Sequence, residues 1–425
     1  MPALFSSSVR ALARFNPRSL AAGFGRLWSA SLVTNLGDGA FLAAGPLLVA
    51  SLSTDPLAVG AAVAVQQLPW LLFALVSGAV VDRVDRRRLI IAVNAARAAI
   101  LALLAALIAV HAATLPILYT ALFVLGAGET LADNATGALV VRLVPRDQLG
   151  TANARLSAVF TVGNQFAGPP LGAWLFAMGA AAPFGLHAAA FAGSALLIAT
   201  IAVPPSDRVI PSSEPPAPPL RQQITEGVQW LWRHPGLRAL TVCIAVMNLT
   251  FMAAFATWVL YSTQRLGLTH IQFGFLLTAG AFGGLAGAWL YPRLERRLGR
   301  ILLVRVGLLV EAATHLVLAV TTNSLVVFAT MTLFGAHAVI WGTVATTVRQ
   351  RSVPDALLGR VTSMFMFASL GAAALGAAAG GLIARAYGLT ACFWIAALGV
   401  TALAIFAWRP LAGVDTEDQQ PDGLR

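Results

Sequence analysis

Two acidic residues lie deep inside long apolar stretches of the sequence, where a carboxyl group can do proton chemistry. Asp38 lies in the apolar run 27–52 and Glu129 in the run 116–141. On helices that rise 1.5 Å per residue, both carboxyl groups would lie about 17 Å from the same face of the molecule. A carboxyl group in apolar surroundings is costly to ionise, so it can bind and release a proton as those surroundings change. Asp38 and Glu129 are therefore the candidate proton-coupling residues; the alternative is a structural carboxylate at the helix break Gly37-Asp38-Gly39.

Other ionisable residues of the apolar runs suggest pairs. Arg97 lies eight residues after the start of the run 89–111, and Asp133 lies eight residues before the end of the run 116–141. These two ends face the same side of the membrane, so we expect a mostly structural ion pair at equal depth. Glu311 and His315 are four residues apart on one helical face, and we expect them to satisfy each other. His337 is the only histidine of its run, and it is either a proton relay or a core histidine.

The elements that carry these residues are apolar helices of membrane length. Hydrophobic residues make up 58% of the chain and charged residues only 11%, against about 25% charged residues in soluble domains. Runs of about 20 apolar residues recur along the chain, each long enough to cross a bilayer. The sequence therefore predicts an all-α polytopic membrane protein with twelve transmembrane helices. The expected spans are residues 27–52, 59–80, 89–111, 116–141, 153–179, 184–203, 237–262, 271–292, 301–320, 325–347, 361–385 and 390–408.

An internal repeat divides the chain into two halves. Three landmarks of the first half recur 209 residues later, each beside an apolar run. One offset that aligns three landmarks indicates a duplicated unit. We therefore expect two pseudo-symmetric six-helix bundles, which are typical of carriers that work by alternating access. The landmarks are Gly78, Val144-Pro145 and Leu149-Gly150, with their counterparts Gly287, Val353-Pro354 and Leu358-Gly359.

The charge of the chain predicts its orientation in the membrane. The net charge is +11, and all 28 basic residues are arginine. Nearly all of them fall at the ends of spans that share one side, and only Arg265 and Arg385 lie near the other side. Because cytoplasmic loops are enriched in basic residues, both termini are expected in the cytoplasm. The membrane explains the positive charge, so nucleic acid is not an expected partner.

The segments outside the two bundles differ in composition from the spans. We favour a cytoplasmic basic arm over a transit peptide for the first residues of the chain. A proline-rich stretch and a helix with one apolar face separate the halves. The expected organisation is a basic arm (1–26), a first bundle (27–203), a linker with an amphipathic helix (204–236), a second bundle (237–408) and a cytoplasmic polar tail (409–425).

The loop that begins at Gly78 resembles the signature of the major facilitator superfamily. It reads Gly78-x-x-x-Asp82-Arg83-x-x-Arg86-Arg87 and departs from the common pattern at Asp85, where the family has glycine. The resemblance covers about residues 25–408. Three further motifs look like the bacterial branch that holds the enterobactin exporter and the macrolide-efflux proteins: Asn35-Leu-Gly-Asp38-Gly, Gly128-Glu129-x-x-x-Asp133-Asn134 and Asn164-Gln-Phe-Ala-Gly168-Pro169-Pro170-Leu-Gly172.

This resemblance implies a latch between the halves on the cytoplasmic side. Asp82 would accept hydrogen bonds from a helix N-terminus or pair with an arginine at the ends of spans 4 and 11, near Arg142 and Arg360. For the loop arginines, positive-inside bias alone is an equally simple explanation. The residues of the expected latch are Gly78, Asp82, Arg83, Arg86, Arg87 and Arg142.

The resemblance also implies a central cavity lined by spans 1, 4, 7 and 10, which Asp38 and Glu129 would face. Apolar walls with a few polar groups suit such a cavity. The further cavity candidates are Asn35, Phe41, Asn248, Phe251, Trp258, His337, Trp341 and Thr347.

The motif Gly168-Pro169-Pro170-Leu-Gly172 is expected to bend or weaken its span, because proline removes amide donors. In the resembled superfamily a Gly-Pro motif at this place marks exporters. The alternative is a packing kink, since small residues in spans allow close helix contact.

The sequence contains no Walker motif, no HExxH and no cysteine-rich metal site. We therefore expect a carrier rather than an enzyme, with no cofactor and with the proton motive force as its energy source. The expected function is proton-coupled efflux of amphipathic small molecules from a bacterial inner membrane by a monomer embedded in the lipid bilayer. The alternatives are a proton-driven uptake symporter and a non-transporting membrane sensor or scaffold.

Overall fold

The computed structural model describes residues 22–202 and 220–413, without the side chains of residues 22, 74–80, 82, 83, 220–224, 355 and 356. The regular structure of these residues is helical throughout, which confirms the all-α prediction. Most of the basic arm, the proline-rich linker and the polar tail lie outside the described residues.

The first half consists of six rods. They are α2 (Ala22–Leu52), α3 (Pro56–Arg83), α4 (Arg86–Ala109), α5 (Leu115–Leu143), a composite rod of α6 (Leu149–Val159), η3 (Phe160–Ala167) and α7 (Gly168–Met178), and α8 (Ala182–Ala199). A short 3₁₀ turn, η2 (Arg146–Gln148), precedes the composite rod.

The second half begins with α9 (Leu220–Arg233), at the place of the expected amphipathic helix. The helices that follow are α10 (Pro235–Phe255), α11 (Trp258–Leu260) with η4 (Tyr261–Arg265), α12 (His270–Val320), α13 (Ser324–Ser352), α14 (Asp355–Tyr387) and α15 (Ala391–Ala407), and then η5 (Pro410–Ala412).

The 51-residue helix α12 contains two of the expected spans. Gly299 has φ 72° and ψ 164°, a non-helical conformation that divides α12 into two arms. Nine helices of the described chain are long and apolar enough to cross a membrane when α12 counts once. Dividing α12, and adding the composite rod and the shorter apolar helix α15, gives the twelve predicted spans.

Side-chain caps fix where several helices begin. Asp55 accepts a hydrogen bond from the Leu57 amide at 3.0 Å and starts α3, and Asn323 caps α13 in the same way. Asp85 accepts from the Arg88 amide at 2.8 Å and starts α4. The departure at Asp85 from the glycine of the resembled signature therefore has a structural reason, because a carboxylate satisfies an amide that the helix leaves free.

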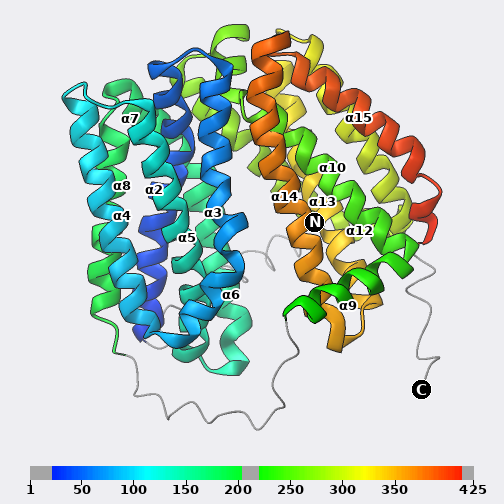
Figure 1. Ribbon diagram of the computed structural model, residues 1–425, viewed down its shortest axis with the longest axis horizontal. Coiled ribbons are helices and arrows are strands. Elements are labelled where there is room, and N and C mark those ends of the chain that lie inside the picture. Colours follow the sequence, from blue (N-terminus) through cyan, green and yellow to red (C-terminus); the bar gives the residue numbers. More distant parts are fainter. Residues whose placement is uncertain (1–21, 203–219, 414–425) are drawn as a thin grey trace, which may run out of the picture.

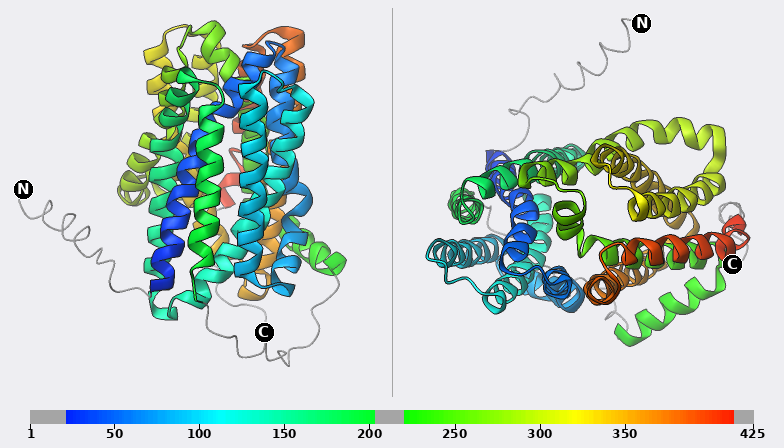
Figure 2. Two further views of the ribbon diagram at one scale, coloured as in Figure 1. Left: turned by 90° about the vertical axis from the view of Figure 1, so that its left-hand side faces the viewer. Right: turned by 90° about the horizontal axis from the view of Figure 1, so that it is seen from above.

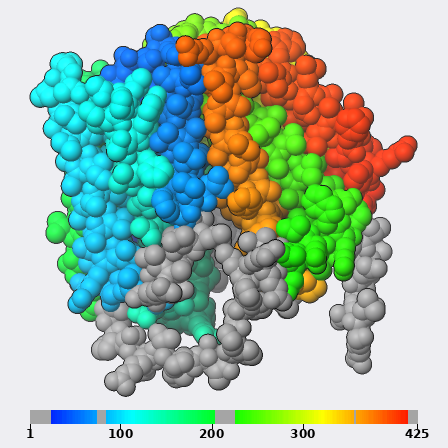
Figure 3. Space-filling view, in the orientation of Figure 1, coloured from blue at the N-terminus to red at the C-terminus, as the bar shows by residue number. Residues whose placement is uncertain are grey.

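The two halves lie side by side and adjoin through α3 with α14 and through α7 with α12 (Figures 1 and 2). A Cβ on Gly60 of α3 would lie 2.7 Å from Cα of Gly381 in α14, and a Cβ on Gly274 of α12 would lie 2.6 Å from Cβ of Ala173 in α7. These glycines let the backbones approach closely. Figure 3 shows α3 and α14 in contact over the upper part of the molecule, in the orientation of Figure 1.

The end of the molecule opposite to these glycine contacts is hereafter called the arginine-rich end. The contacts that two of its arginines make there each lie within one half. Arg87 donates to the carbonyls of Ile198 (3.1 Å) and Ala199 at the end of α8. In the second half, Arg305 donates to the carbonyl of Trp408 at 2.9 Å, just after α15. Each arginine thus satisfies carbonyls that a helix C-terminus leaves free.

Candidate functional site

Asp38 lies on α2 between two glycines that let other elements reach it. A Cβ on Gly37 would lie 2.5 Å from Cδ2 of His187 on α8. A Cβ on Gly39 would lie 2.5 Å from the carbonyl oxygen of Asn164 in η3. Because glycine has no side chain, α8 and η3 both pack directly against α2 at Asp38.

The Gly-Pro motif packs the composite rod against the same stretch of α2. Residues 160–167 form a π-helical segment immediately before Gly168. Pro169 and Pro170 cannot donate backbone hydrogen bonds, so the regular α register fails at this point. A Cβ on Gly168 would lie 2.5 Å from Cα of Gly39, and one on Gly172 would lie 2.0 Å from the carbonyl oxygen of Ala40. The motif therefore fixes the backbone that carries Asp38.

Asp38 has two charged or polar partners. Its Oδ1 is 2.9 Å from Nε2 of His187 and 3.4 Å from Nη2 of Arg97. The guanidinium of Arg97 also lies over the ring of Phe191, 3.9 Å from its centroid. The predicted ion pair between Arg97 and Asp133 is therefore wrong: Arg97 reaches across to α2 and pairs with Asp38.

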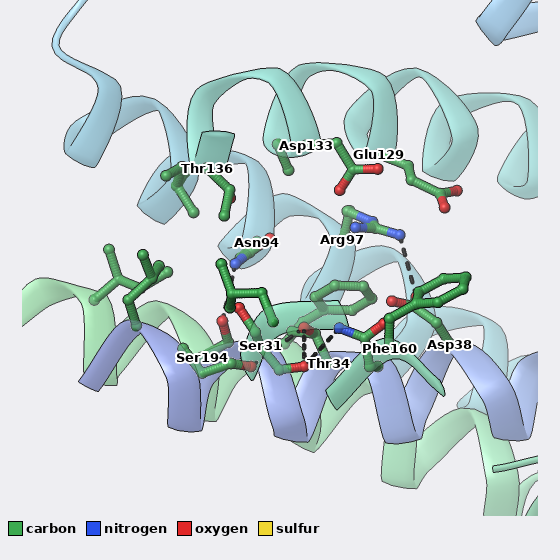
Figure 4. A pocket seen from close by; sticks show the side chains of 18 of the residues that line it. Ser31, Thr34, Asp38, Asn94, Arg97, Glu129, Asp133, Thr136, Phe160 and Ser194 are labelled. Carbon is green, nitrogen blue, oxygen red and sulfur yellow. Dashed lines mark hydrogen bonds and ion pairs between the residues drawn. The ribbon is translucent and has the colours of Figure 1, made fainter. Parts of the chain in front are cut away.

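A polar pocket of about 220 Å³ adjoins this pair. It is lined by Asp38 and Asn35 from α2, Arg97 from α4, and Glu129 and Asp133 from α5. Figure 4 shows Arg97 between the helix that carries Glu129 and Asp133 and the helix that carries Asp38. Every lining residue belongs to the first half, so the pocket lies within that bundle rather than between the two bundles.

The charges around the pocket are unbalanced. Three carboxyl groups face one guanidinium, and Arg97 is paired with Asp38. Among the described residues, neither Glu129 nor Asp133 forms a side-chain hydrogen bond or an ion pair; the ion pair of the pocket joins Arg97 to Asp38. Such a cluster is stabilised by any positive charge that enters, because attraction is strong where water is scarce. The pocket can therefore bind a proton or a cationic group.

Comparisons with known proteins identify the family. Residues 13–423 match the family described as "Transmembrane secretion effector" (MFS_3). The chain belongs to this family. It is a multi-pass membrane transporter, which confirms the predicted resemblance to the major facilitator superfamily and the expectation of a carrier rather than an enzyme.

Individual relatives of the transporter agree with this assignment. It is 37% identical over 134 residues to an uncharacterised MFS-type transporter of Mycobacterium tuberculosis, a stretch that spans 31% of this chain and only 30% of that relative. It is 27% identical over 398 residues to the multidrug efflux pump Tap of Mycolicibacterium fortuitum, over 89% of this chain and 93% of the pump.

A solved structure shows the shared fold. The inward-facing, unoccupied structure of a bacterial homologue of the human lysosomal transporter Spinster matches with a TM-score of 0.72 at 14% identity. The match covers 94% of this chain and 98% of that chain.

Sequence reasoning missed His187 as a member of the transporter's charged cluster. The residue lies in an apolar run, and its imidazole is 2% exposed. Phe41, which was expected to line a cavity, instead packs against this imidazole with ring centroids 5.5 Å apart. The available signal was the pair of glycines around Asp38, since a close-packed α2 requires a partner from another helix.

The expected cavity residues of the second half do not line the pocket. Trp341 is 1% exposed in the second-half core, and Trp258 is buried against Tyr261 and Phe393. Phe251 stacks on Phe334 with ring centroids 4.9 Å apart. The remaining candidates are half-buried: the Asn248 side chain donates to the Ile244 carbonyl at 2.9 Å, and Thr347 adjoins a shallow depression on α13.

His337 belongs to a second charged cluster of the transporter. Its Nε2 is 2.9 Å from Oε2 of Glu311, and Nε2 of His315 is 3.4 Å from Oε1 of the same carboxylate. The expected proximity of Glu311 and His315 is therefore present, but the shorter contact comes from His337 on the neighbouring helix α13.

The latch can be followed only in part. The side chains of Gly78, Asp82 and Arg83 lie outside the described residues. Arg87 closes the end of α8, and Arg142 is exposed at the end of α5. Arg86 is the first residue of α4. Arg360, the expected partner at the start of span 11, forms an ion pair with Glu226 of α9.

Proposed function

We propose that this transporter exports amphipathic cationic small molecules in exchange for protons, by alternating access. The observation that carries the proposal is the first-half pocket, in which Glu129 faces the Arg97–Asp38 pair without a partner of its own among the described residues. A carboxyl group in this setting takes up a proton more readily than one that is already paired. Glu129 is therefore our candidate for the proton carrier, and Asp38 is the fixed charge.

Competition for one site supports exchange rather than cotransport. The pocket has an excess of carboxyl groups, so a proton and a cationic head group each stabilise it. A proton on Glu129 removes the negative charge that would attract the head group. Binding of one therefore disfavours binding of the other, which is the coupling that an antiporter needs.

The size of the pocket limits what it holds. Its 220 Å³ is below the 300–1,000 Å³ or so that typically encloses a drug-sized ligand. We therefore expect the pocket to take the charged head group and a few water molecules, with the apolar body of the substrate outside it. Export agrees with the efflux pump named among the relatives.

The arginine distribution supports an orientation with the arginine-rich end in the cytoplasm of a bacterium, in its inner membrane. In this conformation the halves adjoin at the other end, through Gly60 with Gly381 and Gly274 with Ala173. Substrate would therefore enter from the cytoplasmic side. We expect a monomer in the bilayer that uses no cofactor and is driven by the proton motive force.

The test is transport by the purified protein in liposomes. An acid gradient is imposed across the membrane, and the movement of a cationic dye such as ethidium is recorded for wild type, Glu129→Gln and a control, Glu295→Gln. Glu295 is a carboxylate outside the pocket, 3.6 Å from Arg300. We expect gradient-driven transport by wild type and the control, and background transport by Glu129→Gln.

Two results would overturn the proposal. Dye movement at the same rate with and without the proton gradient would exclude proton coupling. Dye movement in the same direction as the protons would establish cotransport and favour an uptake symporter.

A further inference from the structure

A cluster of three ionisable side chains lies enclosed in the second half, away from the pocket. It consists of Glu311 and His315 on the second arm of α12 and His337 on α13. All three are buried, with exposures of 1%, 1% and 6%. The mechanism proposed above makes no use of them.

Within the described residues, the cluster's ring neighbours are aromatic side chains, and no ion pair joins it to a further charged group. Phe393 of α15 lies with its ring centroid 6.4 Å from that of His315, and Phe334 lies 5.9 Å from His337. The thiol of Cys392 on α15 donates a hydrogen bond to the carbonyl of Gly380 and not to the cluster. The charge state of the cluster is therefore set by its own three members.

Net charge in such surroundings is strongly disfavoured. With both imidazoles neutral and Glu311 ionised, the cluster would carry one uncompensated negative charge. One added proton removes that charge, whether it is on the carboxylate or on an imidazole. The geometry provides a place for it, because Nε2 of His315 lies 3.4 Å from Oε1 of Glu311 without an aligned hydrogen bond.

We propose that Glu311, His315 and His337 form a second proton-binding site of this transporter, enclosed in the conformation described. The proposal rests on the proposed proton-coupled function and adds a second proton to it. The ligand is a proton rather than a metal, since no His, Cys, Asp and Glu group in the described part of the chain has the arrangement of a metal site. The adjoining cavity of about 20 Å³ has room for about one water molecule.

Trp341 is a natural reporter for this site. A Cβ on Gly307 would lie 2.7 Å from Cδ1 of Trp341 and 3.1 Å from Cε1 of His337. The two rings therefore lie against the same glycine. A protonated imidazole quenches the fluorescence of a nearby indole. The difference in fluorescence between wild type and Trp341→Phe therefore isolates the response of Trp341 from that of the other tryptophans.

The first experiment titrates this difference against pH in the purified full-length protein in detergent. We expect a one-proton transition in wild type and in Glu129→Gln, whose change lies in the other half. Glu311→Gln should abolish the transition or move its midpoint by more than one pH unit, and Glu311→Asp should restore it. If Glu311→Gln does not yield a monodisperse protein, His337→Gln replaces it, because glutamine retains a donor for Glu311.

An unchanged transition in Glu311→Gln and in His337→Gln would overturn the proposal. The second experiment measures the number of protons exchanged per dye molecule in liposomes, which should fall by one in Glu311→Gln. An unchanged ratio would also overturn it. If wild type transports no dye at all, the proposed function fails, while the fluorescence titration still decides whether the enclosed cluster binds a proton.

Discussion

The two halves of the transporter bury ionisable residues in different ways. In the first half, the Asp38 side chain is 25% exposed to a pocket that Glu129 and Asp133 also line. In the second half, the Glu311 side chain is 2% exposed and both of its oxygens face imidazoles. The first cluster is open to a ligand of some size, whereas the second is enclosed beside a cavity of only about 20 Å³. The comparison shows that a duplicated fold does not imply duplicated chemistry.

The repeat places these residues at unrelated positions. The offset of 209 residues maps Asp38 onto Met247 and Glu129 onto Ala338, and it maps Glu311 back onto Ala102. No acid of either cluster thus has an acidic counterpart in the other half. Each half has acquired its own polar residues on a common framework of helices.

The framework itself is repeated. A Cβ on Gly172 would lie 2.0 Å from the carbonyl oxygen of Ala40, and a Cβ on Gly376 would lie 2.1 Å from that of Leu249. Ala40 and Leu249 are related by the offset. Spans 1 and 5 therefore pack backbone to backbone, as spans 7 and 11 do, although span 5 contains two prolines, Pro169 and Pro170, and span 11 contains none.

Removal of Arg97 should have the largest effect on stability. Arg97→Met leaves Asp38 with His187 as its remaining partner and also removes the contact with Phe191. We expect a loss of about 3 kcal/mol, because an uncompensated buried charge is costly. Glu311→Gln should cost less, since it leaves two neutral imidazoles. The free energy of unfolding in detergent micelles measures both.

A double variant sharpens this prediction. Asp38→Asn combined with Arg97→Met should recover much of the loss, because no uncompensated charge remains in that pair. Equal losses for Arg97→Met alone and for the double variant would show that packing, rather than charge, dominates the site.

The shared framework predicts equal effects in the two halves. Gly172→Ala and Gly376→Ala should each cost about 2 kcal/mol, because a methyl group would displace a helix backbone. Gly193→Ala and Gly342→Ala are matched controls, since a Cβ at either position meets nothing within 4 Å. Thermal unfolding of the four variants tests this. A loss in one half only would mean that the repeated contacts differ in rigidity.

The two histidine contacts should differ in strength. His187→Phe removes a 2.9 Å hydrogen bond to Asp38 and should cost about 2 kcal/mol, since bonds to charged groups are the stronger ones. His315 makes no aligned hydrogen bond, so His315→Phe should change stability by about 0.5 kcal/mol or less. Similar losses for both would contradict the assigned geometry.

The smallest effect is expected at the surface. Glu226 is paired with Arg360, and their side chains are 35% and 26% exposed. Glu226→Gln should cost about 0.5 kcal/mol, because solvent screens such pairs. The loss should shrink further in 0.5 M salt, which would separate this pair from the buried ones. A salt-independent loss would indicate a packing role for α9.

Much of the fold could be predicted from the sequence, because apolar length and arginine position are local properties. The twelve spans follow from runs of about 20 apolar residues, and even the kinked α12 was expected as two spans. The π-helical segment before Gly168 was not expected as such, since proline predicts a lost hydrogen bond but not the register that replaces it.

The site was harder to predict, because pairing depends on which helices adjoin. Depth alone suggested Arg97 with Asp133, yet Arg97 reaches Asp38 on α2. His187 and His337 find their partners on other helices, through contacts that no spacing along one helix reveals. Sequence reasoning singled out Asp38, Glu129 and Glu311 as acids of apolar runs, and only the packing of α4, α8 and α13 supplied the partners of Asp38 and Glu311.

The glycine contacts that join the halves bear on the equilibrium between the conformations of the proposed alternating access. Gly60 against Gly381 and Gly274 against Ala173 hide little apolar area, because such residues have little or no side chain. Separating these residues alone would expose few hydrophobic atoms, so the apolar cost of parting this end comes from larger side chains such as Phe176, whose ring centroid is 5.4 Å from that of His270. For the alternating access proposed above, these larger side chains set the preferential affinity that a ligand needs to redistribute the population of states. Bulky residues at the glycine positions would clash with the facing helix and hold the two halves further apart at this end.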